Sequence, residues 1–265
     1  MLTTFPFERG IRQGCPLSGQ LYSLCIKPFL CLMRRRLTGI VVPNNRLSLI
    51  LSAYADDVLV FASSARDMQA IYDCSWVYST ASSATINWRK SPGLLIGPMP
   101  IIEFPKPFQE LTWSRNELKY LGVHLSTSSV CSPLVNWKTL GGKIEAKSRD
   151  WSGLLKVLSL RGKTLLIKQF IVPKLMFKIS CISIPEGFLV EMQRKLLNYF
   201  WNGKHWVSLG ILSSLLDEGG QSFPCLRSHN HTSRLKTIQR FLYANPALQW
   251  CSLASYFFSK ALNLE

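Results

Sequence analysis

Two adjacent aspartates, Asp56 and Asp57, lie between two largely apolar runs, Leu47–Leu51 and Val58–Phe61. Both runs are rich in residues that favour strands, so the pattern predicts a β-hairpin that carries the acids at its tip. Neighbouring carboxylates repel each other, and a divalent cation is the usual compensation. Because side chains alternate faces along a strand, the two acids can converge on one ion only if the turn bends them together. A plain Asp-rich turn between strands explains the same residues without any metal.

The segment before the aspartates predicts a loop followed by a helix. Residues 9–18 contain two glycines and a proline, which suit a tight loop where backbone can approach a ligand closely. Apolar residues then recur at helical spacing over about residues 19–37, and a kink is expected at Pro28. Three arginines at 34–36 end this helix. They suit a helix C-terminus, and they could equally contact phosphate.

The segment after the aspartates completes an α+β first part. A second helix is expected from Ser64 to about Thr80, and a short strand at Leu94–Ile96. Residues 97–107 carry four prolines and predict a loop, and residues 119–125 are strand-like. The first part, residues 1–126, is therefore expected to hold antiparallel strands with helices packed on one face.

The chain changes character near residue 130. Residues 134–178 contain ten Lys and Arg against Glu145 and Asp150, with large apolar residues between them. This pattern predicts a helical, basic second region over residues 130–205, including one helix from about Ser159 to Ser180. The remaining residues, 206–265, are expected to form a tail with a short helix around residues 235–242.

The charge balance indicates a polyanionic partner. Thirty-one Lys and Arg against fifteen Asp and Glu give a net charge of +16, and 47% of the residues are hydrophobic, which is a globular composition. Nucleic acid is the simplest partner for such a chain, and an anionic membrane surface is the weaker alternative.

The cysteines and the N-terminus favour an intracellular protein, in the nucleus or the cytoplasm. Eight cysteines are scattered without a C-x-x-C pair, which is typical of free thiols in a reducing compartment. Cys225, His229 and His231 are close in sequence but lack a fourth ligand at suitable spacing, so no metal site is expected there. The start lacks a signal-peptide pattern, and no uncharged apolar run reaches membrane-spanning length.

Two motifs together resemble the reverse transcriptases of non-LTR (LINE-type) retrotransposons. They are Arg12-Gln13-Gly14-Cys15-Pro16-Leu17-Ser18 and, after the predicted helix, Tyr54-Ala55-Asp56-Asp57. The similarity continues through Lys90-Ser91, Tyr120-Leu121-Gly122-Val123, the thumb-like run from Trp151 to Lys168, Phe200-Trp201-Asn202-Gly203-Lys204 and Glu218-Gly219-Gly220-Gln221. The resemblance covers essentially the whole chain, most strongly to about residue 205.

The resemblance implies template-directed transfer of a dNTP onto a primer 3′-hydroxyl, with two Mg2+ ions as cofactor. It implies an RNA template, a DNA primer and dNTP as partners, and no membrane. The site residues that it implies are Asp56 and Asp57 as catalytic metal ligands, Lys90 near the triphosphate, Arg12, Gln13, Gly14 and Tyr54 around nucleotide and template, and Tyr120, Leu121 and Gly122 as the primer grip. The lysines of residues 134–178 would follow the duplex backbone.

One departure from the family pattern concerns the metal site. The family uses a further aspartate upstream of the Arg-Gln-Gly loop, whereas the one carboxylate before Asp56 here is Glu8, in the segment leading into that loop. The chain is therefore expected to be part of a palm with a thumb-like region and a tail, inactive alone, with the upstream half of the polymerase as a further partner. The alternatives are a non-catalytic, basic nucleic-acid-binding protein and a non-functional relic of a decayed element.

Overall fold

The computed structural model of the chain describes residues 14–42, 47–98, 101, 104–128, 131–246 and 248–262. These residues form helices and short strand pairs, which confirms the predicted α+β class. The chain divides into two compact units: unit 1 is Met1–Ser114 with Pro246–Glu265, and unit 2 is Arg115–Asn245. Unit 2 therefore begins before the predicted end of the palm region at residue 126, and the palm, thumb-like and tail boundaries remain a prediction.

Unit 1 alternates helices with short strands. Its elements are α1 (Ser18–Arg36), β1 (Ile40–Val41), β2 (Ser48–Leu49), β3 (Leu51–Tyr54), β4 (Asp57–Val60), α2 (Ala65–Ser82), the 3-10 helix η1 (Trp88–Lys90), β5 (Pro92–Leu94), α3 (Lys106–Gln109), β6 (Thr112–Ser114) and α11 (Gln249–Ala261).

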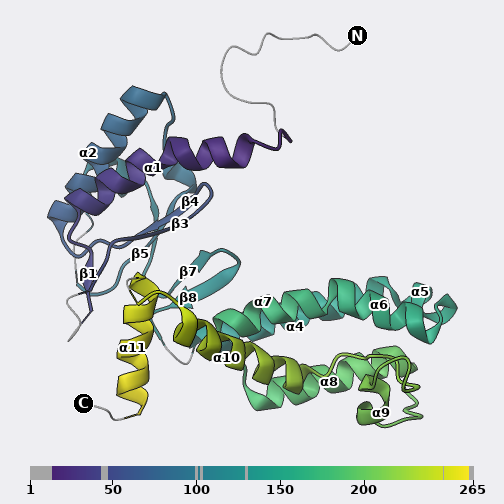
Figure 1. Cartoon of the computed structure of the whole chain (residues 1–265). Helices are drawn as coiled ribbons and strands as arrows, with labels where there is room; N and C mark the ends of the chain where they lie inside the picture. The colour runs from purple at the N-terminus through teal and green to yellow at the C-terminus, as the bar shows by residue number, and fades with distance from the viewer. Residues whose placement is uncertain are drawn as a thin grey trace, which may run out of the picture. The chain divides into compact units, whose positions relative to one another are not determined.

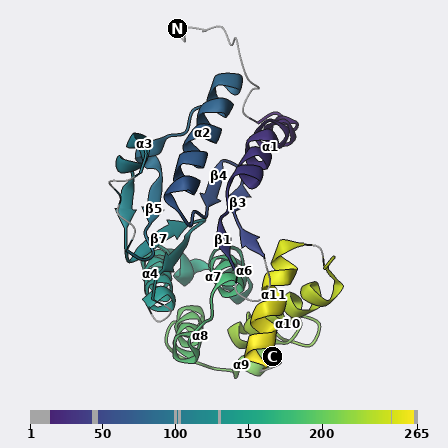
Figure 2. The same ribbon diagram turned by 90° about the vertical axis from the view of Figure 1, so that its left-hand side faces the viewer.

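The two long helices of unit 1 pack against each other and give the unit its core. α1 buries Phe29 and Met33, and the predicted position of this helix is confirmed with Pro28 inside it. α2, the helix predicted from Ser64 to about Thr80, buries Met68, Ile71 and Cys74. Leu95, Phe104 and Phe108 complete the same cluster. Figures 1 and 2 show α1 and α2 side by side, with the β3–β4 hairpin next to α1.

The strands of unit 1 pair two at a time among the described residues. β1 pairs with β2 and β3 with β4, both antiparallel, whereas β5 and β6 are parallel and lie either side of α3 in the chain. The predicted strand at residues 94–96 is found at Pro92–Leu94 instead. Gly93 permits this pairing, because a Cβ there would lie 2.5 Å from the ring of Trp113 on β6.

Unit 2 is one hairpin followed by helices. Its elements are β7 (Glu117–Tyr120), β8 (Val123–Ser126), α4 (Cys131–Asp150), α5 (Ser152–Val157), α6 (Leu160–Phe170), α7 (Val172–Cys181), α8 (Glu186–Trp201), α9 (Leu209–Ser213) and α10 (Leu226–Tyr243).

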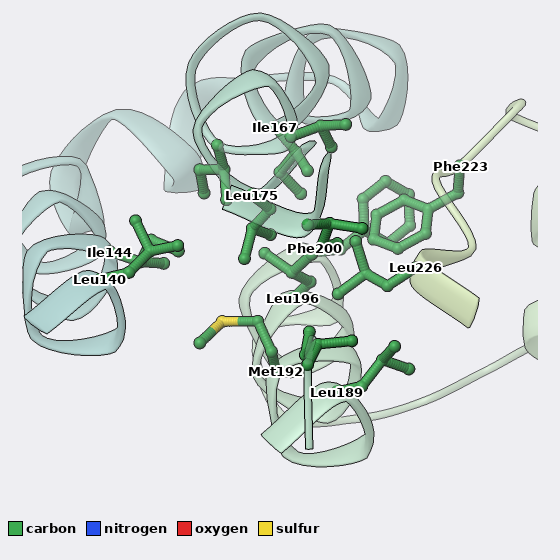
Figure 3. Close-up of a cluster of buried hydrophobic side chains, with 14 of the residues drawn as sticks. Leu140, Ile144, Ile167, Leu175, Leu189, Met192, Leu196, Phe200, Phe223 and Leu226 are labelled. Carbon is green, nitrogen blue, oxygen red and sulfur yellow. The ribbon is translucent and has the colours of Figure 1, made fainter. Parts of the chain in front are cut away.

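The core of unit 2 is formed by side chains from five segments (Figure 3). Leu140 and Ile144 come from α4, Ile167 from α6, Leu175 from α7, and Leu189, Met192, Leu196 and Phe200 from α8, with Phe223 and Leu226 from the start of the α10 segment. Ile167, Leu175 and Phe200 have no exposed surface at all. This burial explains why the basic region folds as helices despite its charge, because most of the lysines occupy the outward faces.

Three sequence predictions in unit 2 were wrong in detail. The segment 119–125 is not a single strand but the β7–β8 hairpin, which turns at Leu121 and Gly122. The helix predicted over 159–180 is divided into α6 and α7, because Pro173 has no N–H to donate to the preceding turn. The short helix expected near 235–242 is the eighteen-residue α10, and α11 follows it in the tail.

Candidate active site and nucleic-acid interface

The two predicted metal ligands lie in a tight turn. In the β3–β4 pair, Tyr54 lies opposite Asp57, so Ala55 and Asp56 form a two-residue loop. Ala55 has a φ of 51°, in the left-handed region that favours glycine, and a turn of this length needs such a residue to match the twist of its strands. The loop therefore holds one strained residue directly beside the acids.

The turn exposes the acids rather than burying them. Asp56 and Asp57 are both exposed, and Tyr54 is 68% exposed. Directly opposed residues of an antiparallel pair share one face, so Tyr54 and Asp57 lie on the same side of the hairpin, while Asp56 belongs to the loop. The predicted hairpin with acids at its tip is therefore present.

A tyrosine on α1 lies within electrostatic range of the turn. Partial burial raises the pKa of the Tyr22 hydroxyl, and the negative charge of Asp56 raises it further. The interaction places the first half of α1 beside the acidic loop, in agreement with the packing of α1 against β3.

The described residues do not by themselves fit a two-metal site. Carboxylate oxygens are the ligands that Mg2+ prefers, so Asp56 and Asp57 have the right chemistry. Within the described part of the chain, however, no group of three or more His, Cys, Asp or Glu side chains could hold a metal ion. Glu8 lies outside the described residues.

The other predicted residues of unit 1 are partly described. Lys90 is exposed and ends η1, where the Asn87 side chain accepts a hydrogen bond from the Lys90 backbone N–H at 3.2 Å. Gly14 has a φ of 93°, and the space where a Cβ would lie is empty, as expected of a loop that a ligand could approach closely. Arg12 and Gln13 lie outside the described residues.

One position that the sequence analysis missed is Asp67, a buried carboxylate in the first turn of α2. It is 2% exposed. Its carboxylate accepts backbone hydrogen bonds from Thr38 at 2.8 Å, Gly39 at 3.2 Å and Ser63 at 3.0 Å, and one from the Ser63 hydroxyl at 3.1 Å. Burial alone would raise the pKa of Asp67, but these hydrogen bonds outweigh it and the pKa is lowered.

Asp67 thereby fixes the base of the acidic hairpin. Ser63 follows β4, and Thr38 and Gly39 join α1 to β1, so one carboxylate ties three segments together. The sequence carried a signal for this position, a serine followed three residues later by an acid at the start of a helix. The Ser64 hydroxyl caps α2 by accepting from the Asp67 N–H at 3.2 Å.

The predicted primer grip forms the turn of the β7–β8 hairpin in unit 2. Tyr120 lies opposite Val123, so Leu121 and Gly122 form a two-residue loop. Their φ angles are 46° and 78°, and positive values at both positions are the pattern of the type I′ turn. Sequence reasoning missed this turn because Leu121 stands where Asn or Asp is usual.

Asn136 on α4 holds this hairpin on the helices. Its side chain accepts from the His124 N–H at 2.9 Å and donates to the His124 carbonyl at 2.7 Å. The buried Lys178 ammonium on α7 donates to the same Asn136 oxygen at 2.7 Å. Asn136 is fully buried, so β8, α4 and α7 meet at one amide.

The basic side chains of unit 2 are largely at its surface. Lys138, Lys143, Arg149, Lys156, Arg161 and Lys174 are exposed, and Lys147 and Lys168 are half-buried. Glu145, one of the two acids in this stretch, pairs with Lys195 on α8 at 2.5 Å. The positive charge of residues 134–178 is therefore available to a polyanion.

Comparison with known proteins finds similarity to reverse transcriptases. A family model described as reverse transcriptase (RNA-dependent DNA polymerase) matches residues 2–125, which include both the β3–β4 and the β7–β8 turns. Over 259 residues the chain is 47% identical to the protein named "Transposon TX1 uncharacterized 149 kDa protein" from Xenopus laevis. That alignment covers 97% of this chain and 20% of the relative, so the chain spans about a fifth of the relative's length.

Proposed function

We propose that the chain is a region of a non-LTR retrotransposon reverse transcriptase and forms part of a polymerase that copies an RNA template onto a DNA primer. The acidic β3–β4 turn carries this proposal, because it presents two adjacent carboxylates at the tip of a short hairpin. Such a turn is a suitable place for cations that assist phosphoryl transfer.

Each unit has a separate role in this proposal. In unit 1, Asp56 and Asp57 contribute carboxylates to the metal site, Lys90 interacts with the triphosphate, and Arg12, Gln13, Gly14 and Tyr54 line the nucleotide and template pocket. In unit 2, Tyr120, Leu121 and Gly122 hold the primer strand, and the exposed lysines of α4, α5 and α7 contact backbone phosphates. No helix in the described part of the chain is long and apolar enough to cross a membrane.

The chain alone is not expected to catalyse the transfer. Two-metal chemistry requires ligands that hold both cations about 4 Å apart, and this normally takes carboxylates from more than one element. The described carboxylates at the turn come from one hairpin. Further ligands would come from a partner segment. The transposon relative is about five times as long as the part of it that this chain covers, so it has room for such a segment.

The basic surface favours a second function, binding of nucleic acid without catalysis. Ten Lys and Arg in residues 134–178 and a net charge of +16 would support this role whether or not the acidic turn becomes part of a complete metal site. The two functions share one requirement, which is affinity for a primer–template duplex.

Salt titration tests that requirement. The affinity of the 265-residue chain for an RNA–DNA duplex should fall steeply as salt rises, because bound lysines release counterions. Replacing Lys138, Lys143, Lys147 and Lys168 with Gln should reduce the slope of log affinity against log salt by about 1 for each phosphate that is no longer neutralised. The measurement is fluorescence anisotropy of a labelled duplex.

A charge-matched control separates local contacts from net charge. Replacing Lys204, Lys236, Arg240 and Lys260 with Gln removes the same charge from outside residues 134–178, and it should change the slope less. Equal affinity at low and high salt, or equal slopes for both variants, would contradict the proposed interface.

A further inference from the structure

An exposed aromatic ring lies against the β7–β8 turn of unit 2, which Leu121 and Gly122 form. Phe177 on α7 is 48% exposed, and its ring edge is 3.9 Å from the position that a Cβ on Gly122 would occupy. The φ of 78° at Gly122 favours glycine there, and no other described side chain approaches that position within 4 Å. The turn and the ring therefore form one continuous surface, and the β7–β8 hairpin and α7 that carry them can be followed in Figure 1.

The exposure of Phe177 is unusual for its helix. Leu175 and Ile179, on the inward face of α7, are buried in the core with 0% and 7% exposure. Lys174, one turn before Phe177, is exposed on the same side of the helix as Phe177. Phe177 is thus an aromatic side chain on the outward face of α7, one turn from the exposed Lys174.

The charge around the turn is positive. Burial lowers the pKa of the Lys178 ammonium, and the positive charges of Lys143 and Lys119 lower it further. Lys178 finds its hydrogen-bond partner in the neutral amide of Asn136. Lys119 is exposed on β7, two residues before Leu121, so its positive charge lies beside the turn, where an anion would stabilise it.

We propose that Phe177 and Lys119 extend the Leu121–Gly122 turn into a binding site for one strand of a nucleic acid. The inference rests on the proposed function, since it takes the turn to face the primer strand. A base or sugar of that strand stacks on the Phe177 ring, and a flanking phosphate contacts Lys119. Asn136 and Lys178 act beneath this surface as positioning residues, because they fix β8 to α4 and α7.

Phe177 variants test the aromatic contact. In anisotropy measurements with a labelled RNA–DNA primer–template, Phe177→Ala should weaken binding by about tenfold, within the range known for loss of one stacked base. Phe177→Leu keeps an apolar side chain beside Gly122 but removes the ring, so it should weaken binding of the primer–template to a similar extent. Phe177→Trp should bind at least as tightly as the parent chain.

Phe170→Ala is the matched control. Phe170 is 53% exposed on the neighbouring α6, where it packs edge-on against Trp151. This variant should bind like the parent. The variant Lys119→Gln should reduce the salt slope by about 1 while leaving the effect of Phe177→Leu intact.

The outcomes separate this inference from the proposed function. If the parent chain binds the duplex with the expected salt dependence but Phe177→Leu binds equally well, the aromatic contact is overturned and the proposed function stands. A parent chain that binds no duplex at any salt concentration would overturn both.

Discussion

At the scale of single residues, the structure distinguishes two exposed acids at the hairpin turn from one buried acid at its base. Asp56 and Asp57 are exposed at a turn whose strain lies at Ala55, whereas Asp67 is buried at the base of the same hairpin. Left-handed backbone at a residue with a Cβ costs of order 1 kcal/mol, and it persists where the surrounding structure holds it. The hydrogen bonds of Asp67 supply part of that support at the exit of β4.

Asp67→Asn should destabilise unit 1 and remove part of its acid sensitivity. The amide can offer one oxygen to the four donors that the carboxylate now satisfies, so we expect a loss of about 2 kcal/mol in the free energy of unfolding at pH 7. The folded-state pKa of Asp67 is lowered, so its contribution is fully present above the unfolded value of about 4 and is lost as pH falls through the folded value.

Urea unfolding of the parent and the variant between about pH 3 and pH 7 measures both effects. The difference in stability between the two proteins should shrink as pH falls below about 4. A difference that stays constant over this range would show that Asp67 contributes through packing rather than as a hydrogen-bonded carboxylate.

At the scale of elements, the two hairpin turns show what the sequence could and could not predict. The β3–β4 hairpin followed directly from two apolar runs around polar residues. The β7–β8 turn was missed because Leu121 gives no turn signal, and its positive φ is held by the tertiary contacts of β8. Likewise the spacing of apolar residues predicted one helix over residues 159–180, whereas the missing N–H of Pro173 divides this segment into α6 and α7.

Contacts between distant residues were the part of the site that sequence reasoning could not reach. Asn136 and Lys178 are separated by 42 positions, and Asp67 and Thr38 by 29. Neither pair has a spacing signature, because the contacts depend on how helices pack after they form. The motif residues themselves were visible from their types and order alone.

Asn136→Ala should loosen the β7–β8 hairpin from the helices. The change removes the side chain that satisfies the His124 backbone groups and the Lys178 ammonium in a buried setting, which we expect to cost about 2–4 kcal/mol of unfolding free energy. Amide hydrogen exchange at His124 should become faster than at core amides of α8.

Asn136→Asp is the informative companion variant. Its carboxylate can still accept from His124 and would pair with the Lys178 ammonium, so it should lose less stability than the alanine variant. Alanine and aspartate variants of equal stability would contradict the assignment of Asn136 as the joint between β8 and α7.

At the scale of the whole molecule, the chain combines an incomplete acidic site with a large positive charge. Unit 1 carries the acidic turn, and unit 2 carries the β7–β8 turn and the exposed lysines of residues 134–178. The family match covers both turns, and the transposon relative covers nearly the whole chain. Binding of nucleic acid should therefore be retained by the chain in isolation even though nucleotidyl transfer should not.

Primer extension on a poly(rA)/oligo(dT) template tests the incompleteness of the acidic site. The purified 265-residue chain is compared with its Asp56→Ala, Asp57→Ala variant in the presence of Mg2+ and dTTP. Absence of a metal ligand suppresses such reactions by orders of magnitude, so neither protein should extend the primer under conditions where both bind the duplex. Magnesium-dependent extension by the parent chain that the variant lacks would contradict this expectation, because the site would then be complete within these residues.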